Sequence, residues 1–172
     1  MTPKMMLFKI PPKRLPMFRK SATLLKELCE RGNVKLKLQD DGVLAIEGDG
    51  GNEWITQQVL SALTLGFKPN QAFKLFGDDY FLEQIDLDLS CRGSEKQIAR
   101  AKARIIGTEG KAMKRIEELT DAHLAVNDNT VALLGKFEDL KLAKEAVFRV
   151  LEGAEHSNVY VYLEKMKARQ QG

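Results

Sequence analysis

The sequence has few of the residues that build disulfide frameworks or metal sites. It contains only two cysteines, Cys29 and Cys91, and two histidines, His123 and His156. These are too few for a disulfide scaffold, and their spacing does not suit a tetrahedral zinc site. A P-loop and a nucleophile with an obvious base are also missing. We therefore expect a protein that is not an enzyme, needs no cofactor and holds inert or buried thiols.

Long apolar runs are also absent. No stretch approaches the roughly 20 residues of a membrane-spanning helix, and the start of the chain lacks the apolar core of a signal peptide. A cytoplasmic protein is the expectation. The 172 residues, of which 44% are hydrophobic, leave room for one medium domain or two small ones.

Positive charge is clustered along the chain although the net charge is only +3. Residues 1–37 contain ten Lys or Arg and two Glu, and residues 91–116 contain eight and two. An acidic stretch over residues 78–88 separates the two segments. This pattern favours a polyanion bound at defined places. The alternative for each cluster is an ordinary solvated surface.

A glycine loop stands out within the second basic segment. Residues 104–111 read RIIGTEGK, an Ile pair that leads into Gly107 and Gly110 and then into a helical pattern. Glycines three apart let a phosphate approach the main chain, and the helix that starts near Lys111 offers unpaired N–H groups and its positive dipole end. Gly48–Gly51 has the same spacing, but it is acidic and follows a strand pattern, which indicates a turn.

Hydrophobic periodicity predicts the same order of elements twice. The first half is expected to contain a strand over 5–10, at most a helical turn over 13–18 because of Pro16, a helix over about 24–31, strands over 34–39 and 43–46, and a helix over 54–65. A short helix over 70–76 follows. The second half is expected to contain a strand over 81–89, a helix over 95–103, the glycine loop, a helix over 111–121, strands over 123–126 and 130–134, a helix over 137–151 and a C-terminal helix within 153–169.

Aligning the two halves without gaps places Arg19–Ala22 where Gly107–Gly110 stands, so the first copy has no glycine in its loop. The predicted division is a first domain at 1–66, a linker with a short helix at 67–80, and a second domain at 81–172.

The repeated order and the glycine loop resemble the type I KH domain, a module that binds RNA or single-stranded DNA. The resemblance implies an α+β fold with two tandem KH domains, each a three-stranded antiparallel sheet packed on helices. Residues 65–76, 104–110 and 153–160 narrow it to the archaeal KH-domain ribosome-assembly family. That family is similar to the eukaryotic partner of the PIN-domain endonuclease that trims small-subunit rRNA.

This resemblance implies a factor that binds single-stranded RNA near the 3′ end of small-subunit rRNA and assists its processing. It also implies contacts with the PIN-domain endonuclease and with the alpha subunit of translation initiation factor two. Glu109 departs from the family pattern, because it adds negative charge between the two glycines. The loss of both glycines leaves RNA binding by the first copy open.

The expected RNA-binding residues combine the loop, the cations around it and an apolar groove. They are Arg104, Ile105, Ile106, Gly107, Thr108, Glu109, Gly110, Lys111, Lys114, Arg115, Leu124 and Val126. For Ile105, Leu124 and the other apolar members, a place in the core is the alternative, and Tyr160 and Tyr162 are expected to pack rather than stack on bases. Two rival functions stay open: an enzyme that uses the acidic residues of 78–88, and a KH-domain protein scaffold or translation-related regulator with weak RNA binding.

Overall fold

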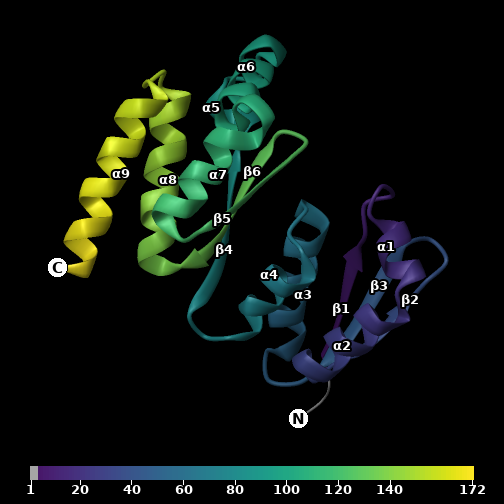
Figure 1. Ribbon diagram of the computed structural model, residues 1–172. Coiled ribbons are helices and arrows are strands. Elements are labelled where there is room, and N and C mark those ends of the chain that lie inside the picture. The colour runs from purple at the N-terminus through teal and green to yellow at the C-terminus, as the bar shows by residue number, and fades with distance from the viewer. Residues whose placement is uncertain (1–3) are drawn as a thin grey trace. The chain divides into compact units, whose positions relative to one another are not determined.

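A computed structural model describes residues 4–172, and the chain divides into two compact units, Met1–Asp78 and Asp79–Gly172. The first unit contains β1 Lys4–Lys9, α1 Leu15–Lys20, α2 Ala22–Gly32, β2 Lys35–Leu38, β3 Val43–Gly48, α3 Asn52–Leu65, α4 Pro69–Ala72 and a 3₁₀ helix η1 Phe73–Phe76. The second contains β4 Tyr80–Asp86, α5 Leu87–Ser90, α6 Glu95–Ile106, a 3₁₀ turn η2 Thr108–Gly110, α7 Lys111–Thr120, β5 His123–Asn127, β6 Thr130–Lys136, α8 Phe137–Leu151 and α9 His156–Gln171. Figure 1 shows these elements.

The first unit is an antiparallel sheet with the strand order β1-β3-β2. Residues of the central strand alternate between buried and half-buried, as a sheet with one covered face requires. Leu44 and Ile46 are fully buried and face the helices α2 and α3, which pack against the sheet.

The second unit repeats this arrangement with the strand order β4-β6-β5. Helices α6, α7 and α8 share one core with the sheet, in which Ile105, Ile116, Leu133 and Val147 are completely buried. The additional helix α9 lies beside α7 and α8 and adds Leu163 to that core. The two three-stranded antiparallel sheets packed on helices confirm the predicted fold class.

Three predicted elements end or begin elsewhere. The strand expected over 81–89 stops at Asp86, because the Asp86 side chain accepts hydrogen bonds from the N–H groups of Asp88 at 2.8 Å and Leu89 at 3.4 Å and so caps α5. The turn expected over 13–18 is the six-residue helix α1, since Pro16 occupies its first turn, where proline is tolerated. Helix α6 extends to Ile106, so both isoleucines before the loop are helical.

The segment predicted as a linker packs within the first unit as far as Asp78. Phe67, Phe73 and Leu75 are buried, and η1 lies against α3. Three large apolar side chains in ten residues give this segment enough apolar surface to fold back onto the unit. Within residues 4–172, no helix is both long and apolar enough to cross a membrane.

Candidate nucleic-acid interface

The two glycines of the loop have different physical roles. Gly107 adopts φ 75° and ψ 175°, a backbone conformation that is essentially restricted to glycine. A Cβ there would lie 2.5 Å from the Cβ and 2.8 Å from the N atom of Ala112. Gly110 adopts φ 75° and ψ 10°, and a Cβ there would meet nothing within 4 Å. Gly107 therefore permits the close packing of the loop on α7, and Gly110 keeps the outer side of the loop open.

Helix α7 begins directly behind this opening. Its N-cap residue is Gly110, which has no side chain to accept hydrogen bonds from the first-turn N–H groups. The Lys111 N–H is bonded to the Thr108 carbonyl, but the N–H groups that follow it have no side-chain cap, and the positive end of the helix dipole also faces an anion at this point. The loop residue Glu109 has a positive φ of 55° and is exposed, so its carboxylate is placed on the outside of the turn.

The cations expected around the loop differ in their ion pairing with carboxylates of the protein. Lys111 and Lys114 are exposed, and Lys111 has only a long contact of 4.0 Å with the Glu109 carboxylate. Arg115 instead forms ion pairs with Glu164 of α9 at 3.1 Å and with Glu118 at 3.5 Å. Of these three cations, the two lysines are therefore the less engaged with carboxylates of the protein itself.

Arg104 is committed to the protein itself, contrary to the expectation that it contacts RNA. Its guanidinium donates to the carbonyl oxygens of Val150 at 2.9 Å and Ala154 at 2.6 Å, at the C-terminal end of α8. The carbonyl of Arg104 accepts a hydrogen bond at 2.8 Å from Nε2 of His156, the first residue of α9. We call these three hydrogen bonds the Arg104–His156 latch. It joins the end of α6, just before Gly107, to the turn between α8 and α9.

The apolar residues proposed to line a groove divide into two groups. Ile105 is 0% and Leu124 5% exposed, and both belong to the core. Their side chains are therefore unavailable to bases, and for these two positions the alternative of a place in the core holds. Ile106 and Val126 are half-buried and remain candidates for apolar contact with bases.

Strand β5 forms an open edge of the sheet, which is where main-chain groups can read base edges. The N–H of Leu124 is already bonded at 3.1 Å to Oε2 of Glu117 on α7. Burial raises the pKa of Glu117, the bond from the Leu124 N–H opposes that rise, and the nearby Glu118 charge adds to it. Because alternate residues of an edge strand present their N–H and C=O on the same side, the main chain of Val126 also faces the open edge.

Helix α9 packs against α7 and is joined to it and to α8 by ion pairs. The Lys167 ammonium lies 2.9 Å from the Asp121 carboxylate at the end of α7 and 2.8 Å from Asp139 of α8. Burial lowers the pKa of Lys167, but the hydrogen bonds to Asp139 and Asp121 outweigh it and raise the pKa overall. Tyr160 packs against the core and Tyr162 lies under the Arg149 guanidinium at 3.7 Å, so both tyrosines pack, as expected.

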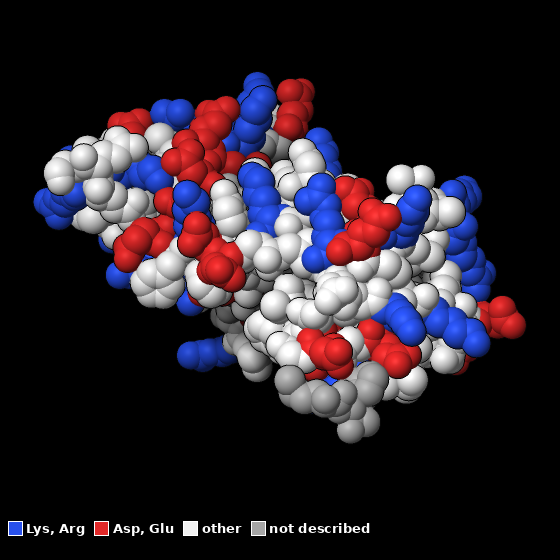
Figure 2. Space-filling model, turned by 90° about the horizontal axis from the view of Figure 1, so that it is seen from below, with Lys and Arg blue, Asp and Glu red and all other residues white. Residues whose placement is uncertain are grey.

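Sequence reasoning missed Glu117, His156 and Lys167 as residues that shape the site. Their partners are 7 to 52 positions away in the chain, in no regular spacing. The surface in Figure 2 shows Lys and Arg interspersed with Asp and Glu, rather than one continuous basic field.

The fold and the loop define a tandem KH-domain protein. A family model for the second KH domain of PNO1 proteins, described as "Eukaryotic type KH-domain (KH-domain type I)", matches residues 81–168. The chain belongs to the PNO1 family of KH-domain proteins.

Three known proteins illustrate the relationship. A KH domain-containing protein of Methanocaldococcus jannaschii is 36% identical over 169 residues, which are 95% of this chain and 74% of the relative. The pre-rRNA-processing protein pno1 of Aspergillus fumigatus is 28% identical over 145 residues, and the match spans 83% of this chain but only 58% of that protein. The structure of Dim2p in an a/eIF2alpha–aDim2p–rRNA complex from Pyrococcus horikoshii matches with a TM-score of 0.85 and 29% identity, covering 97% of this chain and 96% of that one.

Proposed function

We propose that this protein is a ribosome-assembly factor that binds single-stranded RNA near the 3′ end of small-subunit rRNA through its second unit. The sugar-phosphate backbone of the RNA binds at Gly107–Gly110, and the positive charges of Lys111 and Lys114 attract its phosphates. One or two bases lie against Ile106 and the open edge of β5 near Val126. The protein assists processing by holding the RNA rather than by cutting it.

The observation that carries this proposal is the uncapped start of α7. Its first-turn N–H groups have no side-chain cap, the residue before them is a glycine, and the space beyond Gly110 is open. A phosphate in that space would complete the hydrogen bonds that the helix leaves unmade. The fungal relative is named as a pre-rRNA-processing protein, and the Pyrococcus complex contains rRNA. Both names support RNA as the source of that phosphate.

The test is a titration of fluorescently labelled RNA of about 12 nucleotides, long enough to fill a KH groove that clamps about four. One strand carries the 3′ end sequence of small-subunit rRNA from the source organism, and a matched strand carries the same bases in scrambled order. Micromolar or tighter binding that favours the first strand, without cleavage, supports the proposal. Equal binding of both strands would remove the 3′-end assignment, and cleavage would identify an enzyme.

A second function, as a protein scaffold in the same assembly, is favoured by the first unit. Its loop has no glycine and its helix α2 is capped by its own Ser21. The alpha subunit of initiation factor two and the PIN-domain endonuclease are the proposed protein partners, the former because it occurs in the Pyrococcus complex. Pull-down of each purified partner by the full chain, with and without RNA, separates scaffold from RNA-bridged contact.

A further inference from the structure

The sheet of the first unit has one face that its helices leave uncovered. The register pairs Met5 with Glu47 and Leu7 with Ala45, and it pairs Lys35 with Glu47 on the other side of β3. Residues opposite one another in antiparallel strands point to the same face. These five side chains and Lys37, which pairs with Ala45, therefore share the face opposite Leu44 and Ile46. We call this set the open sheet face.

Apolar surface is unusually exposed on this face. Met5 is 64% and Leu7 63% exposed, although both lie in regular strand β1 with their neighbours Met6 and Phe8 turned toward the helices. A single exposed apolar side chain needs no explanation, but two adjacent ones on a sheet form a contact patch. Methionine suits such a patch because its flexible thioether adapts to different partner shapes.

The charge beside this patch is mainly positive. Lys35 and Lys37 are exposed on β2, and neither forms an ion pair within the part of the chain that the structure describes, residues 4–172. Glu47 lies between them and β1 and is half-buried. The face thus presents two unpaired lysines next to an apolar strip.

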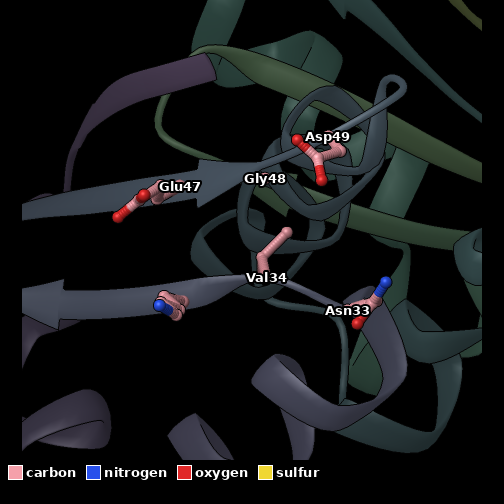
Figure 3. A pocket seen from close by; sticks show the side chains of 6 residues that line it. Asn33, Val34, Glu47, Gly48 and Asp49 are labelled. Carbon is pink, nitrogen blue, oxygen red and sulfur yellow. The ribbon is translucent and has the colours of Figure 1, made fainter. Parts of the chain in front are cut away.

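A hollow lies at the end of this face, where β2 begins and β3 ends. Its lining includes Lys35 and Glu47 of the face together with Asn33, Val34 and Asp49. Figure 3 shows Val34 and Asp49 pointing toward one another across the hollow, with Glu47 beside it on β3. A Cβ at Gly48 would lie 2.8 Å from Cγ1 of Val34, so the glycine allows the strand to approach there.

We propose that the open sheet face binds an acidic, apolar segment of another protein. Leucine-like side chains of that segment would cover Met5 and Leu7, and its carboxylates would pair with Lys35 and Lys37. The described part of this face contains no aromatic residue on which a base can stack, which favours protein over nucleic acid. A second copy of the chain is disfavoured because it would bring like-charged lysines together. This proposal does not depend on RNA binding by the second unit.

The experiment uses the isotope-labelled full chain and a synthetic peptide of about five helical turns, with leucine on one face and glutamate on the other. The matched probe has lysine in place of every glutamate. The expected result is that the acidic peptide shifts the amide resonances of Met5, Leu7, Lys35 and Lys37. The double variant Lys35→Glu with Lys37→Glu should bind the acidic peptide about tenfold or more weakly than the parent, because two charge pairs with the peptide are lost.

The control variant reverses Lys20→Glu and Lys26→Glu, two exposed lysines on the helices of the same unit, and it should bind the acidic peptide like the parent. The proposal fails if the acidic peptide does not bind, or if the basic peptide binds equally well. It also fails if a labelled single-stranded RNA, rather than the peptide, shifts the same resonances, or if sedimentation shows that the face joins two copies of the chain.

Discussion

The two units have the same order of elements but differ at the start of the second helix. In the first unit, the hydroxyl of Ser21 accepts a hydrogen bond at 3.1 Å from the N–H of Leu24 and so caps α2. In the second unit, Gly110 stands before α7 and provides no side-chain cap, so beyond the Lys111 N–H, which is bonded to the Thr108 carbonyl, the first turn has no side-chain acceptor. A capped helix start is stabilised by about 1 kcal/mol. An uncapped start gives up that stability but can bind an anion, so the difference supports the proposal that the second unit binds RNA and the first serves as a scaffold.

The largest expected effect comes from closing the opening in front of α7. Gly110→Asp adds a carboxylate to the open space while keeping a backbone conformation that aspartate tolerates. RNA affinity should fall by about one to two orders of magnitude, since the new side chain both caps the helix and repels phosphate. Fluorescence anisotropy measures the affinity, and thermal unfolding shows that the fold is intact.

The matched variant is Ala22→Asp, at the first residue of α2, which the gap-free alignment of the two halves pairs with Gly110; it should leave RNA affinity unchanged. Equal losses in the two variants would contradict the division of roles. Gly107→Asp is a poorer test, because its side chain would collide with the backbone of Ala112 and disrupt the loop directly.

A smaller loss is expected from charge reversal. Lys111→Glu with Lys114→Glu should weaken RNA binding by about tenfold and reduce the salt slope by about 0.7 for each phosphate contact removed. Arg19→Glu with Lys20→Glu makes the same change in net charge beside the first loop, where Arg19 is bonded to the Asp40 carbonyl at 2.9 Å. That pair should weaken binding modestly and equally for all RNA sequences. RNA affinities measured at several salt concentrations distinguish the two double variants. A greater loss of affinity in the Arg19/Lys20 variant than in the Lys111/Lys114 variant would show that the first unit makes the main phosphate contacts.

The Arg104–His156 latch should affect the RNA indirectly. Arg104→Met removes the guanidinium donor to the Ala154 carbonyl and one donor to the Val150 carbonyl, which still accepts from the Gly153 N–H; losing these partly buried charged hydrogen bonds costs about 1–3 kcal/mol of folding free energy. RNA affinity should fall severalfold with an unchanged salt slope, because the residue positions the loop and does not contact phosphate. Arg14→Met is the control, since Arg14 makes a similar bond to the Thr64 carbonyl in the first unit. A drop of about 0.7 in the salt slope for Arg104→Met would instead show a direct phosphate contact.

The smallest effect concerns the carboxylate at the edge of β5. Because the pKa of Glu117 is raised above its ordinary value of 4.5, the folded state favours its neutral form, and its contribution to stability is lost as the pH rises above that value. Glu117→Gln keeps an acceptor for the Leu124 N–H without the charge.

The variant should therefore gain stability relative to the parent between pH 4.5 and neutrality, by an amount within about 0.5 kcal/mol as is usual for partly exposed sites. Chemical denaturation at several pH values measures it. A variant that loses stability as the pH rises would show that the charged carboxylate is the favoured form.

The sequence by itself determined the order of the elements and the place of the glycine loop. These depend on short-range physics: apolar periodicity, capping residues such as Ser94 and the freedom of glycine at positive φ. The same local rules predicted Arg104 as an RNA contact and 67–80 as a linker, because the residues that Arg104 and this segment contact in the fold are not their neighbours in the sequence.

Only the tertiary structure decided what each residue in the loop region does. Arg104 donates hydrogen bonds to carbonyls 46 and 50 positions away in the chain, and His156 is hydrogen-bonded to the Arg104 carbonyl, 52 positions away. Phe73 is buried, and its helix η1 packs on α3. Such contacts form where the packed helices bring an accessible carbonyl next to a donor, and no regular spacing in the sequence predicts them. The exposure of Met5 and Leu7 has the same origin, because a strand pattern alone does not say which face the helices will cover.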